Sequence, residues 1–161
     1  MDRVKRATGH SAGAARDIGC KPETGTDARF TWDVRVYYED TDLGGVVYHA
    51  NYLRFMERAR TEWLRSLGFE QDALRDHHGV LFVVVEAEVA FRRPARFNDE
   101  LVVSVEVRRS GRASLGFHQE VRRASAGHEL FCAGEIRVAC IDADTFKPRV
   151  LPQEILRELV E

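Results

Sequence analysis

The sequence lacks three features that would each place it in a broad class of proteins. Its longest apolar run covers residues 80–85, far fewer than the roughly 20 residues of a membrane-spanning helix. Its three cysteines, Cys20, Cys132 and Cys140, are an odd number without C-x-x-C spacing, which argues against a disulfide scaffold or a zinc ribbon. Basic and acidic side chains number 24 and 26, so a protein that coats nucleic acid is not expected. The cysteine pattern favours free thiols in a reducing cytosol.

The first 28 residues differ in composition from the rest of the chain. Val4 and Ile18 are their only large aliphatic side chains, among small, polar and charged residues. Such a segment cannot bury enough apolar surface to offset the entropy lost on ordering, so we predict that residues 1–28 are disordered. No apolar stretch follows their basic residues, and a secretory signal is therefore not predicted. Residues 29–161 are expected to form one domain.

Hydrophobic periodicity predicts the elements of this domain. A helical period over residues 50–67 indicates one long helix, with Gly68 placed to end it. Residues 153–160 read as a short terminal helix, and a single helical turn is expected near His77. Alternation of apolar and polar residues predicts five strands, at residues 30–38, 83–91, 101–107, 115–121 and 130–140.

The order of these elements predicts the fold class. Most of the strands are joined by short turns, such as Ser110-Gly111 and Ala126-Gly127, and short connections imply an antiparallel sheet. The single long helix must be covered by that sheet. We therefore expect an α+β domain in which a five-stranded antiparallel sheet wraps around one long central helix. Such a unit leaves sheet edges open, which predicts a homodimer with its sheets joined edge to edge.

The densest cluster of chemically special residues lies between the first strand and the long helix. Asp40 and Asp42 place two carboxylates close together, a glycine pair follows, and His49 stands at the expected helix start. Taken singly, these residues fit an Asx turn, a connector and a helix cap. Together they supply a carboxylate that activates water or attacks directly, and helix-terminal amides that stabilise an oxyanion. That combination is what acyl transfer to water requires.

A calcium loop is the competing interpretation of the two aspartates. Counted from Asp40, the fifth position of an EF-hand loop would be Gly44, and the twelfth, which needs a glutamate, would be Asn51. A calcium site is therefore not predicted. The histidines have no convincing ligand partners either, so we expect no metal.

Three motifs make the chain similar to a known family. They are V-Y-Y-E-D-T-D over residues 36–42, G-G-V-V-Y-H-A-N-Y over residues 44–52, and F-x-E-R-A-R-T-E over residues 55–62. These stretches resemble the hotdog-fold acyl-CoA thioesterases, and the most similar branch looks like the Tol-Pal-associated thioesterases, relatives of 4-hydroxybenzoyl-CoA thioesterase. The resemblance covers about residues 30–158.

The resemblance implies a function and its setting. The substrate would be an acyl-CoA, with no cofactor besides the coenzyme A that the substrate carries. A homotetramer becomes as plausible as a homodimer, and Tol-Pal or lipid-synthesis proteins become possible partners. The location would be cytoplasmic, either free or peripheral at the inner membrane.

The resemblance also implies roles for individual residues. Asp42 would be the catalytic carboxylate, acting as nucleophile or as general base. His49 would be the accessory catalytic residue, with its backbone amide polarising the thioester carbonyl. Tyr48 and Asn51 would line or brace the substrate site.

Coenzyme A carries phosphates, for which arginine side chains are well suited. Arg112 and Arg109 flank the Ser110-Gly111 turn, and by resemblance Arg112 is the best candidate. Arg92 and Arg93 end an earlier strand and form a second basic pair. Any one of these arginines could equally belong to an ordinary solvated edge.

Two other functions remain open at this point. The domain could be a scaffold that docks lipid-synthesis or envelope partners, or a hotdog hydratase or dehydratase. The helical histidine and acidic arrangement of the hydratases is not found here. Glu57 lies on the long helix, and we interpret it as structural, paired with Arg60 at i,i+3, rather than as catalytic.

Overall fold

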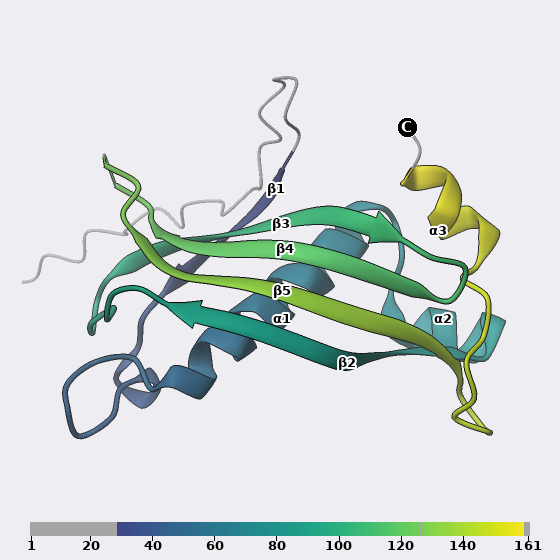
Figure 1. The fold of residues 1–161 in the computed structure, drawn as a ribbon, viewed down its shortest axis with the longest axis horizontal. Coiled ribbons are helices and arrows are strands. Elements are labelled where there is room, and N and C mark those ends of the chain that lie inside the picture. Colours follow the sequence, from purple (N-terminus) through teal and green to yellow (C-terminus); the bar gives the residue numbers. More distant parts are fainter. Residues whose placement is uncertain (1–28, 126, 160–161) are drawn as a thin grey trace, which may run out of the picture.

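The computed structural model describes residues 29–125 and 127–159. The disorder predicted for residues 1–28 and the position of Cys20 lie outside the described residues. Within them, the predicted α+β architecture is present (Figure 1).

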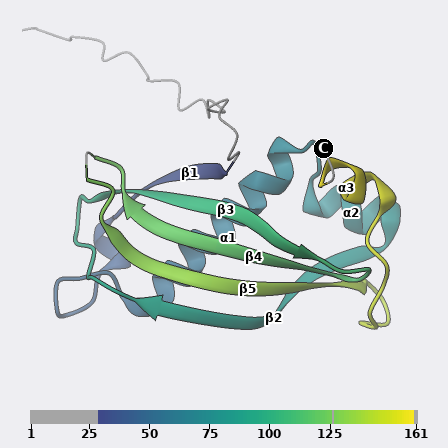
Figure 2. The ribbon, with the colours of Figure 1, turned by 45° about the horizontal axis from the view of Figure 1, so that its top comes forward.

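One antiparallel sheet forms the outer layer of the domain, and all five predicted strands belong to it. Its strands, in spatial order β1-β3-β4-β5-β2, are β1 (Phe30–Arg35), β3 (Glu100–Ser110), β4 (Ser114–Arg123), β5 (Leu130–Asp142) and β2 (Val80–Phe91). The three central strands follow one another through short connections, as predicted. The sheet curves around the long helix, which crosses its inner face diagonally (Figures 1 and 2).

The long helix α1 spans His49–Ser66, within one residue of the predicted range at each end. Gly68 follows it with a φ of 87°, the left-handed conformation that ends many helices. One side of α1 is buried against the sheet, through Asn51, Tyr52, Phe55, Met56, Ala59, Trp63 and Leu64.

The core lies between this side of α1 and the inward side chains of the sheet. The strand β4 shows the alternation clearly, because Leu115, Phe117 and Val121 are buried while their neighbours are half-exposed. The rings of Trp63 and Phe117 meet edge to face, with 5.2 Å between their centroids. Removing a buried aromatic ring of this kind typically costs about 3–5 kcal/mol of folding free energy. The contact therefore fixes the helix on the sheet.

Two elements differ from the prediction. The helix α2 (Gln71–His78) has two turns where one was expected, because Leu74 is its single buried residue and gives no readable period. The strand β1 ends at Arg35 instead of continuing to residue 38, since residues Tyr38–Asp40 form a 3-10 helix. Tyr38 is consequently 81% exposed, although its place in the alternation predicted an inward side chain. The terminal helix α3 spans Gln153–Glu158.

The described cysteines are free thiols, as predicted. Cys132 and Cys140 are both buried. Burial raises the pKa of Cys132 to about 12 and also raises the pKa of Cys140. Neither thiol is therefore ionised near neutral pH, and neither can serve as a nucleophile.

None of the helices in residues 29–125 and 127–159 is long and apolar enough to cross a membrane.

Candidate active site

The loop between β1 and α1 is anchored at its base by Asp40. The Oδ2 of Asp40 accepts a hydrogen bond from the Tyr37 amide at 2.8 Å. Its carbonyl oxygen accepts two more at 2.9 Å, from the Tyr48 amide and from the Asn51 Nδ2. Asp40 is only 7% exposed, so these bonds satisfy a buried polar group. Asp40 thus shapes the loop, and Asn51 braces it from the first turn of α1.

Beyond this base the loop is a small hairpin. Thr41 and Val47 form an antiparallel bridge, and the Asp42 amide donates to the Val46 carbonyl at 3.0 Å. The Gly45 amide donates back to the Asp42 carbonyl at 2.9 Å, which closes the turn. Gly45 has a φ of 71°, a conformation that favours glycine. The chain therefore leaves β1, reverses at Asp42 and enters α1 directly.

The side chain of Asp42 is exposed at the tip of this hairpin. Its Oδ1 accepts a hydrogen bond from the Gly44 amide at 2.8 Å. Within residues 29–125 and 127–159 its carboxylate forms no ion pair. A Cβ atom at Gly44 would lie 3.0 Å from the same oxygen, so a larger residue would crowd the carboxylate. One carboxylate oxygen is thus oriented by the loop, and the other is available to water or substrate.

The start of α1 supplies hydrogen-bond donors. The helix begins at His49, and its cap residue Tyr48 makes no side-chain bond to the first turn. The amide of Asn51 donates to the Tyr48 carbonyl at 2.8 Å. The amides of His49 and Ala50 have no acceptor in the part of the chain that the structure describes. Such amides, with the positive end of the helix dipole, can bind an oxygen that gains negative charge.

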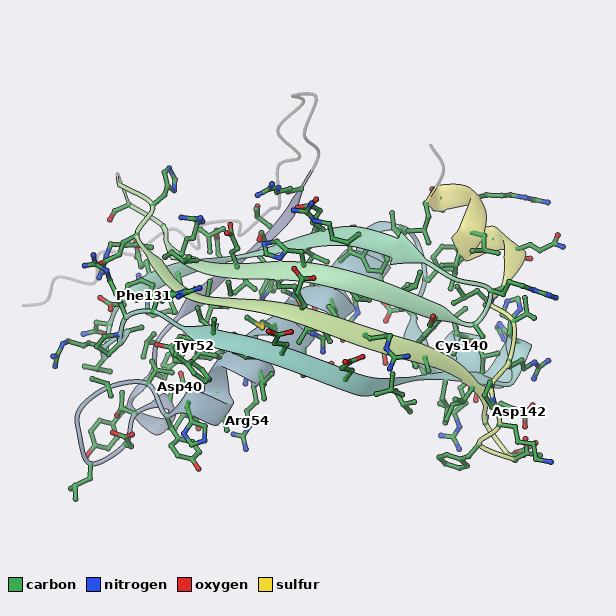
Figure 3. The ribbon with its side chains drawn as sticks, viewed as in Figure 1. Asp40, Tyr52, Arg54, Phe131, Cys140 and Asp142 are labelled. Atoms are coloured by element: carbon green, nitrogen blue, oxygen red, sulfur yellow. The ribbon has the colours of Figure 1, made fainter. Side chains whose placement is uncertain are left out.

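The His49 ring borders an open cavity of about 260 Å³. The centroid of the His49 ring lies 4.4 Å from the centroid of the Tyr48 ring and 6.2 Å from that of the Phe91 ring. Tyr52 closes the inner side; its hydroxyl accepts a hydrogen bond from the Ala95 amide at 2.9 Å, and burial raises its pKa. Figure 3 shows Tyr52 and Asp40 at the same end of the sheet. The cavity is lined by Val47, His49, Tyr52, Phe91, Arg92, Arg93 and Pro94.

The predicted phosphate-binding arginines lie elsewhere. β1 ends where Arg35 pairs with Glu100, at the start of β3, and the Asp42 loop follows from there. The backbone of Arg109 pairs with that of Gly116 close to the other end of β3. Arg112 lies in the next turn. The 11 residues of β3 span roughly 35 Å at the usual rise per residue. Within one copy, the structure therefore does not bring Arg109 and Arg112 to the Asp42 loop.

Arg92 and Arg93 are the cations beside His49. Arg93 forms an ion pair with Glu129 at 2.8 Å. Arg92 is exposed and has no ion pair among the described residues. The sequence points to both arginines but gives no reason to prefer them to Arg109 and Arg112 as phosphate contacts. Their position beside His49 arises because the end of β2 lies next to the start of α1. Phe91 was missed as a site residue for the same reason.

The predicted ion pair between Glu57 and Arg60 is wrong. The Glu57 Oε1 accepts a hydrogen bond from the Thr61 hydroxyl at 2.9 Å. The Arg60 Nη1 donates instead to the Gln119 Oε1 at 2.6 Å. Gln119 is fully buried and offers its oxygen on the side of α1 that faces the sheet. The arginine therefore makes its hydrogen bond toward the core and none with Glu57.

No group of three or more metal-binding side chains comes together among the described residues. The site consists of a carboxylate, helix-terminal amides, an imidazole and an aromatic cavity. This chemistry can polarise a carbonyl group and deliver a carboxylate to it.

A sheet wrapped around one helix, with a carboxylate on the hairpin before that helix, defines a class of protein. Residues 36–159 match the family model described as the thioesterase-like superfamily. The chain belongs to this superfamily, and its fold is the hotdog fold of related thioesterases of solved structure.

The particular relatives are acyl-CoA thioesterases. The chain is 46% identical over 129 residues to the acyl-CoA thioester hydrolase YbgC of Escherichia coli O6:H1, covering 80% of this chain and 94% of the relative. It is 42% identical to the acyl-CoA thioesterase YbgC of Haemophilus influenzae, with coverages of 80% and 93%.

Solved structures agree with this family. A probable thioesterase from Bartonella henselae is 36% identical, with a TM-score of 0.72 and coverages of 78% of this chain and 100% of that one. Slr0204, a 1,4-dihydroxy-2-naphthoyl-CoA thioesterase from Synechocystis, is 25% identical, with a TM-score of 0.77 and coverages of 83% and 96%.

Proposed function

We propose that the protein hydrolyses an acyl-CoA thioester to a free carboxylic acid and coenzyme A. The observation that carries this proposal is the hairpin that holds the Asp42 carboxylate directly before the free amides of α1. A reacting carbonyl group placed between them would meet a carboxylate on one side and hydrogen-bond donors on the other. The names of the YbgC relatives support the same substrate class.

In the proposed reaction, the thioester oxygen accepts hydrogen bonds from the amides at the start of α1. His49 contributes its backbone amide, and the helix dipole favours the negative charge that develops on the oxygen. The His49 and Tyr48 rings line the acyl side of the carbonyl group, while Asn51 keeps the loop in register through Asp40. These roles are the ones that the sequence motif predicts.

Two routes for Asp42 fit this geometry. As a general base, its carboxylate takes a proton from water, and the hydroxide forms a C–O bond as the C–S bond breaks. As a nucleophile, it attacks the carbonyl carbon, expels the thiolate and forms an anhydride, which water then hydrolyses. Both routes end with a carboxylic acid and a protonated thiol. An unlabelled oxygen in the acid after a single turnover in water labelled with heavy oxygen would demonstrate the nucleophile route, because only an anhydride opened at Asp42 transfers an oxygen from the enzyme to the acid.

We assign the first contacts with the coenzyme phosphates to Arg92 and Arg93, since both line the cavity that contains His49. Arg112 and Arg109 stay predicted phosphate contacts. Because they lie near the far end of β3, they would have to act on a substrate bound to another copy.

We further propose that the protein works as a homodimer joined through β2, or as a homotetramer of two such dimers. β2 has 12 residues and, among the described residues, pairs with β5 alone. It carries Val84 and Val85 at 51% and 49% exposure, next to the exposed Glu86 and Glu88. The other edge, β1, has only 6 residues and exposes the charged Asp33 and Arg35. Charged, short edges resist pairing, whereas a long apolar edge favours it. Sedimentation of Val84→Lys, with Asp33→Lys as its control, should show dissociation in the first variant alone.

The test of function is a panel of acyl-CoAs incubated with the wild type and with Asp42→Asn, with release of free thiol as the readout. Hydrolysis by the wild type and its loss in the variant are the expected results. Full activity in Asp42→Asn would remove the role of that carboxylate. If the wild type hydrolysed no thioester while capturing Tol-Pal or lipid-synthesis proteins, the scaffold alternative would replace this proposal.

A further inference from the structure

Three cavities follow the boundary between α1 and β2. The first is the cavity beside His49, and the second and third have volumes of about 330 Å³ and 90 Å³. We call this series the α1–β2 seam. Along α1 its lining advances from His49 through Leu53 to Leu64, and along β2 it retreats from Phe91 to Phe82. α1 takes a diagonal path across the sheet (Figures 1 and 2).

The seam beyond His49 is mainly apolar. A chain of methylene groups would be favoured there because each group is removed from water. The apolar side chains of the second and third cavities are Leu53, Trp63, Leu64, Phe82, Val84, Ala87, Leu115, Phe117, Ile136 and Val138.

Arg60 lines both of these cavities together with Glu57, and Arg54 also lines the second. Its Nη1 donates to the Gln119 Oε1 at 2.6 Å. Gln119 is held in turn, because its Nε2 donates to the Met56 carbonyl at 3.0 Å and to the Ser104 carbonyl at 3.4 Å. The guanidinium is thus fixed in position from the core side.

The rest of the guanidinium has no protein partner in the described residues. Arg60 forms no ion pair there, and its Nε and Nη2 atoms make no hydrogen bond. Burial lowers the pKa of Arg60, and the charge of Glu57 offsets part of that effect. A half-buried cation is costly unless it is paired. The Nε–Nη2 edge is also one of the two edges with which arginine grips a carboxylate.

We propose that the α1–β2 seam holds the acyl chain and that Arg60 binds a carboxylate at its far end. The substrate class would then be the monothioesters of dicarboxylic acids with coenzyme A. About 16 Å of helix separates the Cα atoms of His49 and Arg60. Because helical side chains lean toward the N-terminus, the guanidinium lies closer to the thioester than that. The distance suits a chain of medium length. This inference rests on the proposed thioesterase function.

The experiment compares kcat/KM for suberoyl-CoA and octanoyl-CoA, which have equal chain lengths and differ in the distal carboxylate. We expect the wild type to prefer suberoyl-CoA and Arg60→Gln to lower the ratio of the two values at least tenfold. Gln119→Glu should also lower it, because the new carboxylate would occupy Arg60 internally. Arg58→Gln is the matched control; Arg58 is exposed on α1, lines none of these cavities, and its loss should leave the ratio unchanged.

The possible outcomes are distinct. A wild type that hydrolyses octanoyl-CoA as well as or better than suberoyl-CoA overturns the role of Arg60 while leaving the thioesterase function intact. The same holds if Arg60→Gln lowers both values equally. If neither thioester is hydrolysed, the proposed function itself fails. Should Arg60→Gln not fold, inhibition of the wild type decides the question: free suberate should inhibit more strongly than octanoate, and equal inhibition would contradict the proposal.

Discussion

The base and the tip of the loop before α1 each carry an aspartate, and the two aspartates have opposite roles. At the base, Asp40 is buried and its oxygen atoms accept hydrogen bonds from two backbone amides and one side chain. At the tip, Asp42 is exposed and its carboxylate accepts one bond, from the Gly44 amide. One carboxylate maintains the shape of the loop, and the other is left free to react. A D-x-D pattern by itself does not show which is which.

The largest expected difference between the two ends is in catalysis. Asp42→Asn should lower kcat/KM by roughly 10²–10⁴-fold, the usual effect of removing a catalytic acid or base. The melting temperature should stay unchanged because the side chain is exposed. Thiol release and thermal denaturation measure the two effects, with Asp33→Asn as an exposed control on β1. A melting temperature that fell with activity would mean that the tip is structural too.

Substitution of Asp40, at the base of the loop, should lower the stability of the fold. Asp40→Ala removes the acceptor of the Tyr37 amide from a buried site, which should cost about 1–3 kcal/mol of unfolding free energy in urea denaturation. Asp40→Asn keeps an oxygen acceptor and should cost less. If Asp40→Ala lost as much activity per folded molecule as Asp42→Asn, without a loss of stability, the assignment of the two residues would have to be reversed.

A smaller loss of stability is expected at the brace between the base and α1. Asn51→Ala removes the donor to the Asp40 carbonyl and should cost about 1–2 kcal/mol. Gln71→Ala serves as the comparison, since its amide also makes a side-chain hydrogen bond but at an exposed position. Equal unfolding free energies for the two variants would show that the bond of Asn51 adds nothing.

The smallest expected effect on activity separates the two glycines of the tip. Gly44→Ala should lower kcat/KM a few-fold, because its Cβ would press on the Asp42 carboxylate. Gly45→Ala should lower stability by about 1–2 kcal/mol through its left-handed backbone. Measuring activity and unfolding for both variants tests this division, and identical profiles would contradict it.

The sequence predicts those parts of the fold that rest on local patterns. The buried side of α1 and the inward and outward alternation of the five strands follow from side-chain periodicity. α1 begins within one residue of its expected start. The 3-10 helix at Tyr38–Asp40 has no such signal, because it depends on where one carboxylate binds an amide. α2 escapes notice because it buries a single residue.

The candidate site divides in the same way. Asp42, Tyr48, His49 and Asn51 are neighbours in sequence, and the structure keeps them on one hairpin and helix start. The position of Arg92 beside His49, and the separation of Arg112 from this loop, depend on which ends of β2 and β3 lie near the loop. The contact of Arg60 with Gln119 joins a helix to a distant strand, and i,i+3 spacing along the helix pointed to the wrong partner.

The pairing of β1 with β3 also bears on how the active protein forms. β3, β4 and β5 are joined by short turns, so their pairing closes only small loops of chain. β1 finds its partner only when Phe30 meets Val105 across the whole of α1, α2 and β2. Closing long loops costs more entropy and is slow. The meander of β3, β4 and β5 is therefore expected to fold first. The hairpin that carries Asp42 lies between β1 and α1 and is expected to reach its catalytic geometry last. A folding intermediate would contain most of the sheet and none of the catalytic geometry.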